Sequence, residues 1–271
     1  LHSEGPAPLD TSDILRREVS VKVRAAGWSD RGLVRENNED AFGMIDQDAE
    51  PGTEPCYVVC DGLGGARAGE VASRTAVGAF LRAWRSTVAA TGTAERLDAA
   101  ARSANMAVYQ FSLTDRSMKG MGTTLVALAP HGNQAYVCNI GDSRCYRIHR
   151  GTLTLLTEDH TVAAEMVREG LLDADGAMES GWRNALTRAV GTQSVETPDV
   201  TSHPMEPGDR FLLCSDGLWS AIPEVQIVSS LFRCRAEEGA RLLVELANEA
   251  GVADNATALV IDIEAVDSQG D

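Results

Sequence analysis

The sequence CYVVCDG at residues 56–62 gives the clearest indication of the fold. Its five apolar residues in succession are typical of a short strand that is buried on both faces. The Asp61-Gly62 pair then ends the predicted strand abruptly, because this dipeptide favours a turn. From Gly69 to about Thr91 the apolar residues recur at intervals of three and four, which predicts a helix. A buried strand therefore leads through an acid and a glycine into a helix.

Four more acids stand beside predicted strands. They are Asp40, preceded by Glu39, before AFGMI; Asp142 after AYVCNIG; Asp216 after FLLCS; and Asp254, separated by one residue from ATALVIDI. Because strands hold their ends on rigid backbone, acids from several strands can meet at one rim of a sheet. Such like charges repel one another unless a cation binds between them. A single Asp-Gly is more often a turn, so turns and a metal site both stay open at this point.

The type of donor indicates which cation such a site would select. The acids supply only oxygen, with no pair of His or Cys nearby, and oxygen ligands favour hard ions such as Mg²⁺ or Mn²⁺. One bridging carboxylate with other acids around it would hold two ions about 3.5–4 Å apart, the spacing that activates a water against a phosphoryl group. Gly62 fits this interpretation because its carbonyl, without a side chain beside it, can approach an ion closely.

The predicted elements come in runs of strands and pairs of helices. The strands are predicted at residues 19–25, 41–45, 56–60, 123–129, 134–140, 144–149, 153–156, 209–215 and 256–265, and the helices at 69–91, 94–115, 162–169, 223–232 and 237–250. This order favours α+β layers over the strict alternation of a doubly wound sheet. No repeat, low-complexity linker or boundary divides the sequence. We therefore predict one domain at 19–266, with a flexible leader at 1–18 and a tail at 267–271.

Composition and charge exclude several classes of protein. The 271 residues are 44% hydrophobic, enough for a sizeable core, and the net charge of −16 argues against a nucleic-acid partner, since such binders neutralise phosphates with Lys and Arg. The six cysteines form no CxxC pair, and five lie within or beside apolar runs, which predicts buried, reduced thiols. No stretch approaches the ~18 consecutive apolar residues of a membrane span. We therefore expect a cytoplasmic protein without a membrane partner, and a monomer by default.

Eight motifs occur in one order along the chain. They are RGLVRENNEDAF, VVCDGLGGARAGEVAS, MGTTLVAL, VCNIGDSRCYRI, LTEDHT, NALTRAVG, GDRFLLCSDGLW and ADNATALVI. Together they resemble the metal-dependent protein phosphatases, the type 2C serine/threonine phosphatases, in their compact bacterial form. The resemblance covers roughly residues 20–265. It implies an αββα sandwich, in which two central antiparallel sheets are flanked by pairs of helices.

The resemblance also implies a set of metal ligands and a residue that binds the substrate. Asp61 would bridge two Mn²⁺ or Mg²⁺ ions, and the other ligands of these ions would be the Gly62 carbonyl, Asp216 and Asp254. Asp40 would bind directly or through water, with Glu39 as a weaker candidate. Asp142 and Asp216 would hold a third ion. Arg35 resembles the family's arginine whose guanidinium binds the substrate phosphate. The planar guanidinium suits this role because it can donate two parallel hydrogen bonds. Arg35 and Asp61 would be the catalytic residues.

Three features depart from this pattern or add to it. Leu63 stands where some family members carry a His that is proposed as a general acid, so the group that protonates the leaving group stays unassigned. Residues 159–192 overlap the flap of the family, and their glycines fit a mobile lid as well as an ordinary surface excursion. His160 is expected to pack locally, beside a helix that Asp159 or one of its neighbours caps.

The function implied by the resemblance is that of a metal-dependent serine/threonine phosphoprotein phosphatase. A metal-activated water would attack phosphorus without a phosphoenzyme intermediate, and the substrates would be phosphoproteins of a bacterial Hanks-type kinase or the kinase itself. A pseudophosphatase that acts as a binding module is the first alternative, but it would require the loss of ligand acids that are all present. The acidic surface argues against a two-metal nuclease, whereas a small-molecule phosphoesterase stays open.

Overall fold

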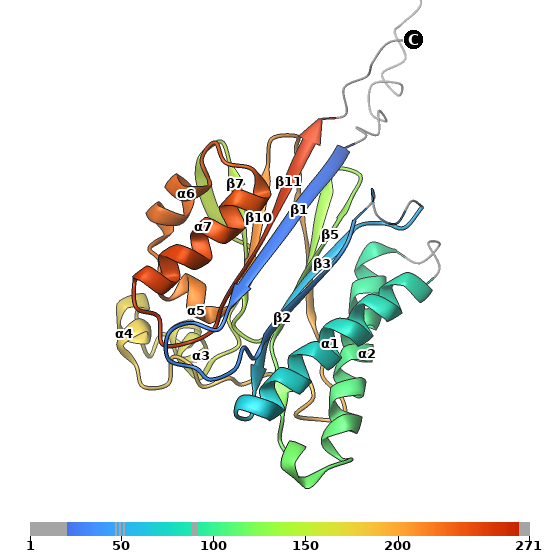
Figure 1. Cartoon of the computed structure of the whole chain (residues 1–271), viewed down its shortest axis with the longest axis vertical. Helices are drawn as coiled ribbons and strands as arrows, with labels where there is room; N and C mark the ends of the chain where they lie inside the picture. The colour runs from blue at the N-terminus through green and yellow to red at the C-terminus, as the bar shows by residue number, and fades with distance from the viewer. Residues whose placement is uncertain (1–20, 47, 49, 51, 88–91, 266–271) are drawn as a thin grey trace, which may run out of the picture.

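The computed structural model describes residues 21–46, 48, 50, 52–87 and 92–265, and its centre is a pair of antiparallel sheets packed face to face (Figure 1). A layer of helices covers the outer face of each sheet, so the predicted αββα sandwich is confirmed. The predicted leader at 1–18 and tail at 267–271 lie outside the described residues.

The six-stranded sheet carries the helix pair that follows CYVVCDG. Its order is β2 (Asp40–Ile45), β3 (Cys56–Leu63), β5 (Leu125–His131), β6 (Gln134–Ile140) and β9 (Asp199–Pro204), with β4 (Gly122–Thr123) paired to β3. Helices α1 (Ala66–Ser86) and α2 (Thr93–Ser112) pack on the outer face through a core that includes Phe80, Trp84 and Leu97. A short 3-10 helix, η2 (Arg116–Met118), follows α2.

The five-stranded sheet joins the first described strand to the last one. Its order is β1 (Val21–Asp30), β11 (Ala256–Ala265), β10 (Arg210–Cys214), β7 (Arg144–His149) and β8 (Thr152–Leu155). In the antiparallel β1–β11 pair, Val21 lies opposite Ala265. Helices α6 (Glu224–Leu231) and α7 (Ala236–Glu249) cover the outer face of this sheet, and the single-turn α5 (Asp216–Trp219) follows β10.

The alternation of side chains along β3 decides what lies between the sheets. Val58 and Cys60 pack in the core under the helices, whereas Tyr57 and Val59 pack in the core between the two sheets. Asp61 continues the second series, because successive side chains of a strand point to opposite faces. The carboxylate of Asp61 is therefore directed toward the space between the sheets, at the end of the sandwich.

Most predicted elements are confirmed to within a few residues, and the errors have local causes. The prediction that the strand ends at Asp61 is wrong, because Gly62 and Leu63 still pair with β4. The first strand continues past its predicted end at residue 25 to Asp30, since the whole of β1 pairs with β11. Helix α1 begins at Ala66 and ends at Ser86, earlier than predicted at both ends; residues 88–91 of the predicted helix lie outside the described residues.

Besides η2, three short elements were not predicted from the sequence. Strand β9 exposes most of its side chains and shows no apolar alternation. Helix α4 (Ala174–Glu179) lies with α3 (Val162–Arg168) in the segment 159–192, and α5 is only four residues long. Thr161 caps α3 by accepting a hydrogen bond from the Ala164 N–H (3.1 Å), whereas Asp159 forms an ion pair with Arg144 (2.7 Å). A neighbour of Asp159 is thus the cap.

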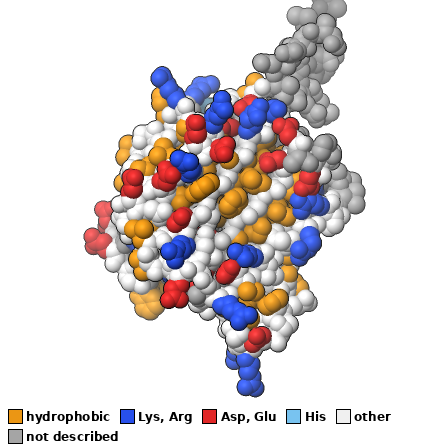
Figure 2. Space-filling model, in the orientation of Figure 1, with side chains coloured by type: hydrophobic (Ala, Val, Ile, Leu, Met, Phe, Trp, Pro, Cys, Tyr) orange, Lys and Arg blue, Asp and Glu red, His pale blue; other side chains and the backbone are white. Residues whose placement is uncertain are grey.

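The cysteines are free, as predicted: five are buried and Cys234 is half-buried. In the part of the chain that the structure describes, no helix combines the length and the apolar character that a membrane span requires. Figure 2 shows charged side chains of both signs around an apolar strip, over the edge strands β1 and β2.

Candidate active site

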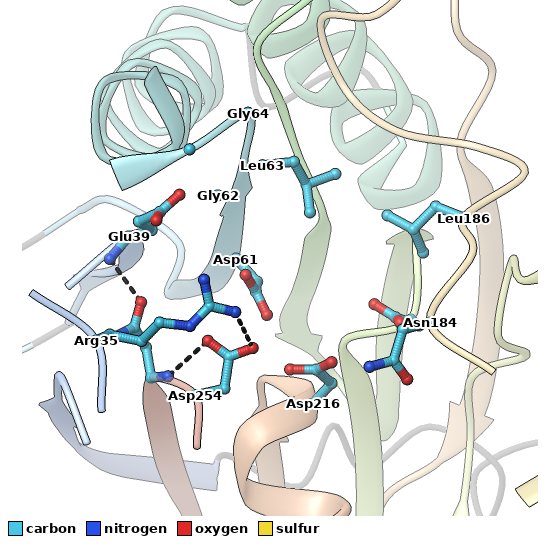
Figure 3. Close-up of a pocket in the computed structure, with 13 residues that line it drawn as sticks. Arg35, Glu39, Asp61, Gly62, Leu63, Gly64, Asn184, Leu186, Asp216 and Asp254 are labelled. Carbon is cyan, nitrogen blue, oxygen red and sulfur yellow. Dashed lines mark hydrogen bonds and ion pairs between the residues drawn. The ribbon is translucent and has the colours of Figure 1, made fainter. Parts of the chain in front are cut away.

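Loops and strand ends from both sheets surround a pocket of about 220 Å³ (Figure 3). Six of the seven predicted site residues line it, namely Arg35, Asp61, Gly62, Asp142, Asp216 and Asp254. The weaker candidate Glu39 lines it as well. The remaining predicted residue, Asp40, is buried opposite Asp61 in the β2–β3 pair. The structure thus brings the predicted residues together at one end of the sandwich.

Asp40 connects the two sheets. Its Oδ2 accepts hydrogen bonds from the hydroxyl of Ser215, which follows β10 (2.7 Å), and from the hydroxyl of Thr257 in β11 (2.6 Å). Its Oδ1 is buried and accepts no hydrogen bond from the described residues. One oxygen of Asp40 therefore stabilises the sandwich, and the other remains a buried acceptor beside the pocket.

The main chain of Asp61 is held by Thr123, the last residue of β4, and by Thr124, which follows it. The Asp61 N–H donates to Thr124 Oγ1 (2.9 Å), and its carbonyl accepts from the Thr124 N–H (2.8 Å) and the Thr123 hydroxyl (2.8 Å). At the next residue, a Cβ on Gly62 would lie 2.2 Å from the carbonyl oxygen of Gly69. Only a glycine allows β3 and the start of α1 to approach so closely, which explains the Asp-Gly pair.

The five-stranded sheet supplies the acids on the opposite wall. Asp216 is the first residue of α5, and its Oδ1 is buried without a hydrogen bond from any described residue. Asp254 accepts a hydrogen bond from Arg35 Nη2 at 2.7 Å. On the third side, Asp142 is 5% exposed, and its carbonyl accepts a hydrogen bond from the indole N–H of Trp219 (3.0 Å). These three acids therefore reach the pocket from separate parts of the chain.

Besides Gly64 and Gly65, three residues of the pocket were not predicted from the sequence, which are Asn184, Leu186 and Asn255. Asn255 holds the loop between β1 and β2, because its side chain accepts from the Glu39 N–H (2.8 Å) and donates to the carbonyls of Arg31 (2.8 Å) and Asn37 (3.0 Å). The motifs ADNATALVI and NALTRAVG contain all three residues. An amide gives no pattern of its own in a sequence, so only the packing identifies these roles.

Burial and mutual repulsion raise the pKa values of the acids in this cluster. Burial, with the charge of Asp216 acting in the same direction, raises the pKa of Asp142 to about 8 and that of Asp40 to about 7, although the two hydroxyls oppose the shift at Asp40. The pKa of Asp61 is raised well above its usual value by burial and by the charges of Asp40 and Asp216. Ionisation of all these carboxylates therefore reduces the free energy of unfolding, unless a positive charge nearby offsets their repulsion.

We expect the metal-free protein to lose stability as the pH rises from about 4 to about 8. Above about pH 4 the unfolded chain has released protons that the folded cluster still binds, so the stabilising contribution disappears as the pH rises through the raised pKa values. For Asp40 and Asp142 these values are about 7 and about 8. The melting temperature in EDTA should fall across this range, and Asp142→Asn should make the fall shallower. An identical fall in Asp142→Asn would contradict the expectation.

The donors of the pocket fit a hard divalent cation. Carboxylates and the Gly62 carbonyl offer only oxygen, and the unpartnered Oδ1 atoms of Asp40 and Asp216 are buried acceptors that a cation would satisfy. Among the described residues, no three His, Cys, Asp or Glu side chains already form a compact metal-binding group. Figure 3 instead shows Asp61, Asp216 and Asp254 directed toward the same space. A cation would draw these side chains together.

The fold and the pocket together define a class of protein: an αββα sandwich with a cluster of acids where its two sheets end. The model of the family described as protein phosphatase 2C matches residues 34–246. The chain belongs to the protein phosphatase 2C family.

Named relatives support this assignment. The serine/threonine phosphatase stp of Listeria welshimeri is 36% identical over 239 residues, which are 86% of this chain and 93% of that protein. The serine/threonine protein phosphatase PstP of Mycobacterium tuberculosis is 36% identical over 245 residues, which are 90% of this chain and 46% of that protein. A crystal structure of the catalytic domain of PstP in complex with two manganese ions has a TM-score of 0.78 at 36% identity and covers 90% of this chain and 100% of that one.

Proposed function

We propose that this chain is a metal-dependent serine/threonine phosphoprotein phosphatase, which hydrolyses phosphoserine and phosphothreonine. The observation that carries the proposal is the group of carboxylates from both sheets around one pocket, with Arg35 beside them. Membership of the protein phosphatase 2C family and the similarity to named serine/threonine phosphatases support the same activity. The reaction is the hydrolysis of a phosphoric monoester.

The acids are proposed as ligands of two Mn²⁺ or Mg²⁺ ions, with a third ion at one side. In this proposal the ligands are Asp61 as the bridge, the Gly62 carbonyl, Asp216, Asp254, Asp40 directly or through water, and Asp142 with Asp216 for the third ion. Bound ions of this kind lower the pKa of a water and neutralise the charge that develops on the phosphoryl group. The relative PstP, whose structure contains two manganese ions, supports the choice of Mn²⁺.

Arg35 is proposed to bind the substrate phosphate. Its side chain is 48% exposed and forms an ion pair with Asp254. The planar guanidinium can donate two parallel hydrogen bonds to phosphate oxygens once Asp254 is engaged by a cation. Because Asp254 already directs Arg35 toward the pocket, the phosphate would meet a guanidinium that needs little rearrangement.

Direct attack by water, without a phosphoenzyme intermediate, agrees with the chemistry of the neighbouring residues. The thiol of Cys60, next to Asp61, is fully buried, and burial raises its pKa well above the usual value, so it is no nucleophile. Leu63 lines the pocket where some family members carry a His, and its side chain has no proton to donate. The group that protonates the leaving group must therefore lie elsewhere.

We also propose the biological setting of this activity. The substrates would be phosphorylated proteins, including a bacterial Hanks-type serine/threonine kinase or its targets, so that the protein acts in signal transduction. The net charge of −16 supports a protein substrate rather than a nucleic acid. Residues 19–266 are proposed to act as one catalytic domain with a flap at 159–192, in a monomer located in the cytoplasm.

Phosphate release from a phosphothreonine peptide tests the proposed function. We expect release that requires Mn²⁺, stops in EDTA, and exceeds the release from nucleotides and sugar phosphates. Faster release from these small molecules would indicate a small-molecule phosphoesterase. Folded protein that releases no phosphate with any metal would instead indicate a binding module.

Arg35→Ala is expected to raise the KM for the phosphopeptide by about 10–100-fold, because a hydrogen bond to a charged group contributes about 1.5–3 kcal/mol. Arg35→Lys should recover only part of this loss, since an ammonium cannot donate in the bidentate geometry. Steady-state kinetics at saturating Mn²⁺ provide the measurement, with Arg31→Ala in the same loop as the control. Equal KM values for Arg35→Ala and the control would exclude phosphate binding by Arg35.

A further inference from the structure

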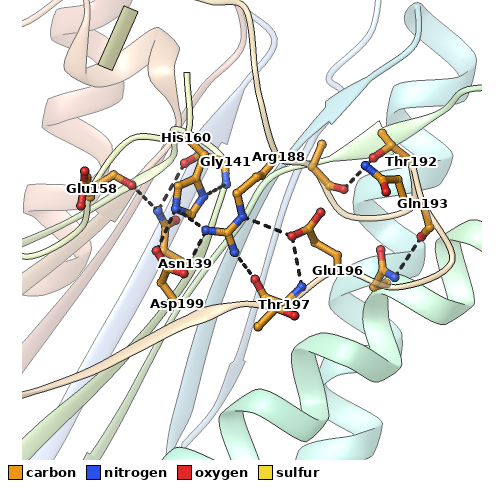
Figure 4. A network of polar contacts seen from close by, with 12 residues as sticks. Asn139, Gly141, Glu158, His160, Arg188, Thr192, Gln193, Glu196, Thr197 and Asp199 are labelled. Carbon is orange, nitrogen blue, oxygen red and sulfur yellow. Dashed lines mark hydrogen bonds and ion pairs between the residues drawn. The ribbon is translucent and has the colours of Figure 1, made fainter. Parts of the chain in front are cut away.

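A network of polar contacts joins the segment 159–192 to the turn that carries Asp142 (Figure 4). His160 lies at its centre, and its side chain is 3% exposed. The network also contains Arg188, at the end of the segment, and Asp199, at the start of β9. None of these three residues lines the acidic pocket, and none has a role in the proposed chemistry.

The hydrogen bonds of His160 fix the position of the proton on its ring. The Gly141 N–H lies 3.0 Å from Nδ1, and a backbone N–H can only donate, so Nδ1 must be an acceptor. The neutral ring then carries its proton on Nε2, which donates to Asp199 Oδ2 at 3.0 Å. Arg188 Nη1 also lies 2.9 Å from Nε2, but a guanidinium can only donate, and the same Nη1 has an acceptor in Asp199 Oδ1. Burial lowers the pKa of His160, and the Arg188 charge acts in the same direction against the opposing effect of Asp199. The ring is therefore neutral at physiological pH.

The other groups of the network orient the ring. Arg188 Nη1 donates to Asp199 Oδ1 (2.9 Å), and its Nε donates to Glu196 Oε1 (3.2 Å). A further hydrogen bond joins Arg188 Nη2 to the carbonyl of Thr197. These contacts place the Asp199 carboxylate where it accepts the Nε2 proton. The second nitrogen of the ring is thereby turned toward Gly141.

His160 holds the Gly141 peptide from two directions. Its ring accepts from the Gly141 N–H, and its own N–H donates to the Gly141 carbonyl at 3.0 Å. Gly141 has a φ of +105°, and a Cβ there would lie 2.7 Å from the Thr124 side chain, so the turn is confined on its other side as well. Together with the hydrogen bonds from Asn139 Nδ2 to the Gly141 carbonyl (3.2 Å) and from the Trp219 indole to the Asp142 carbonyl (3.0 Å), these contacts fix the direction in which Asp142 points.

The backbone of His160 also anchors the wall of the pocket. Its carbonyl accepts a hydrogen bond from the Thr187 N–H (2.9 Å), and the next pair along joins the Val162 N–H to the Ala185 carbonyl (2.9 Å). Leu186, between these two pairs, lines the acidic pocket. One residue thus fixes both the Asp142 turn and the segment that faces it.

We propose that His160 is a positioning residue, which uses Nδ1 to hold the Gly141–Asp142 turn so that the Asp142 carboxylate faces the pocket and can join a divalent cation. This inference rests on the proposed function, because it takes Asp142 as a cation ligand. Groups that orient a ligand from outside the coordination sphere typically change metal affinity by about 10–100-fold when they are lost.

Two substitutions at residue 160 distinguish the effect of the Nδ1 acceptor from the effect of the volume of the ring. In His160→Asn the amide oxygen can take the place of Nδ1, whereas in His160→Gln the amide lies near the place of Nε2. Calorimetric titration of the metal-free full chain with Mn²⁺ measures the binding of Mn²⁺ in the absence of any substrate. We expect the weakest Mn²⁺ site to lose about tenfold in affinity in His160→Gln and about twofold or less in His160→Asn. His203→Gln, on β9, is the matched control and should leave the isotherm unchanged.

Two results would overturn the proposal. One is a wild-type isotherm for folded His160→Gln, and the other is an equal loss in both variants, which would assign the effect to the ring's volume. If His160→Gln does not fold, the tautomer of His160 is determined in the unaltered protein from long-range ¹H–¹⁵N spectra of its five histidines. A protonated Nδ1 at His160 would exclude the acceptor role. Neither measurement needs phosphate release, so a failure of the proposed function would be seen separately.

Discussion

Asp61→Asn is expected to reduce phosphate release from a phosphothreonine peptide by about 10³-fold, and at the same time to raise the melting temperature of the metal-free protein at about pH 8. The activity falls because an amide of the same shape lacks the negative charge that a bridging ligand supplies. The stability rises because the pKa of Asp61 is raised by burial and by the charges of Asp40 and Asp216, so removal of its charge relieves repulsion.

The opposite signs of the two effects distinguish a ligand from a residue that only supports the fold. A structural residue would lose activity and stability together. Asp98→Asn provides the control, since Asp98 lies on α2 in an exposed ion pair with Arg102 and should change neither quantity much. Phosphate release with Mn²⁺ and thermal unfolding in EDTA are the two measurements. A lower melting temperature for metal-free Asp61→Asn would contradict the electrostatic account of the cluster.

Gly62→Ala is expected to reduce both stability and activity, in contrast to the previous substitution. Its Cβ would lie 2.2 Å from the carbonyl oxygen of Gly69 and 2.7 Å from that of Glu39, and both contacts are with backbone. The strand β3 would have to move away from α1, which costs about 2–3 kcal/mol of the free energy of unfolding. Displacement of the Gly62 carbonyl and of Asp61 should reduce phosphate release by about 100-fold.

Gly78, which lies in α1, gives the matched control for this experiment. A Cβ at Gly78 would approach only the flexible end of Arg82, at 3.2 Å. Gly78→Ala should therefore stabilise the protein by about 0.5–1 kcal/mol, because alanine favours the helix. Denaturant unfolding and phosphate release measure both variants. Equal stability of Gly62→Ala and the unaltered protein would show that the close approach of β3 and α1 is not required.

The sequence predicts the sandwich well where burial imposes a pattern. CYVVC at residues 56–60 and ATALVIDI at residues 256–263 are buried strands in the structure, because short, largely apolar runs next to turn residues favour strands that are buried on both faces. Strand β9 escapes prediction because most of its side chains are exposed without alternation, and its pairing with β6 depends on backbone hydrogen bonds. The extension of β3 to Leu63 depends on the distant β4 and has no local signal.

The same reasoning explains which parts of the site are visible in the sequence. The pocket acids are visible because an acid beside an apolar strand is unusual, and all of them lie at one end of the sandwich. Asn255, Thr124 and His160 are not visible as functional residues, because their importance lies in contacts with residues far away in the chain. Such roles depend on which main-chain groups need a partner in the fold, and no spacing rule encodes them.

The pairing of β1 with β11 has a consequence for the synthesis of this protein. The first strand finds its partner only when residues 256–265 have been made, so the five-stranded sheet cannot close on a nascent chain that still lacks β11. Until residue 216 has been made, the growing polypeptide carries Asp40, Asp61 and Asp142 without either acid of the opposite wall. Because domains form as the ribosome releases them, the six-stranded half and its helices can assemble first. The acidic pocket is then completed last, and a translation product that ends before Asp254 lacks part of it.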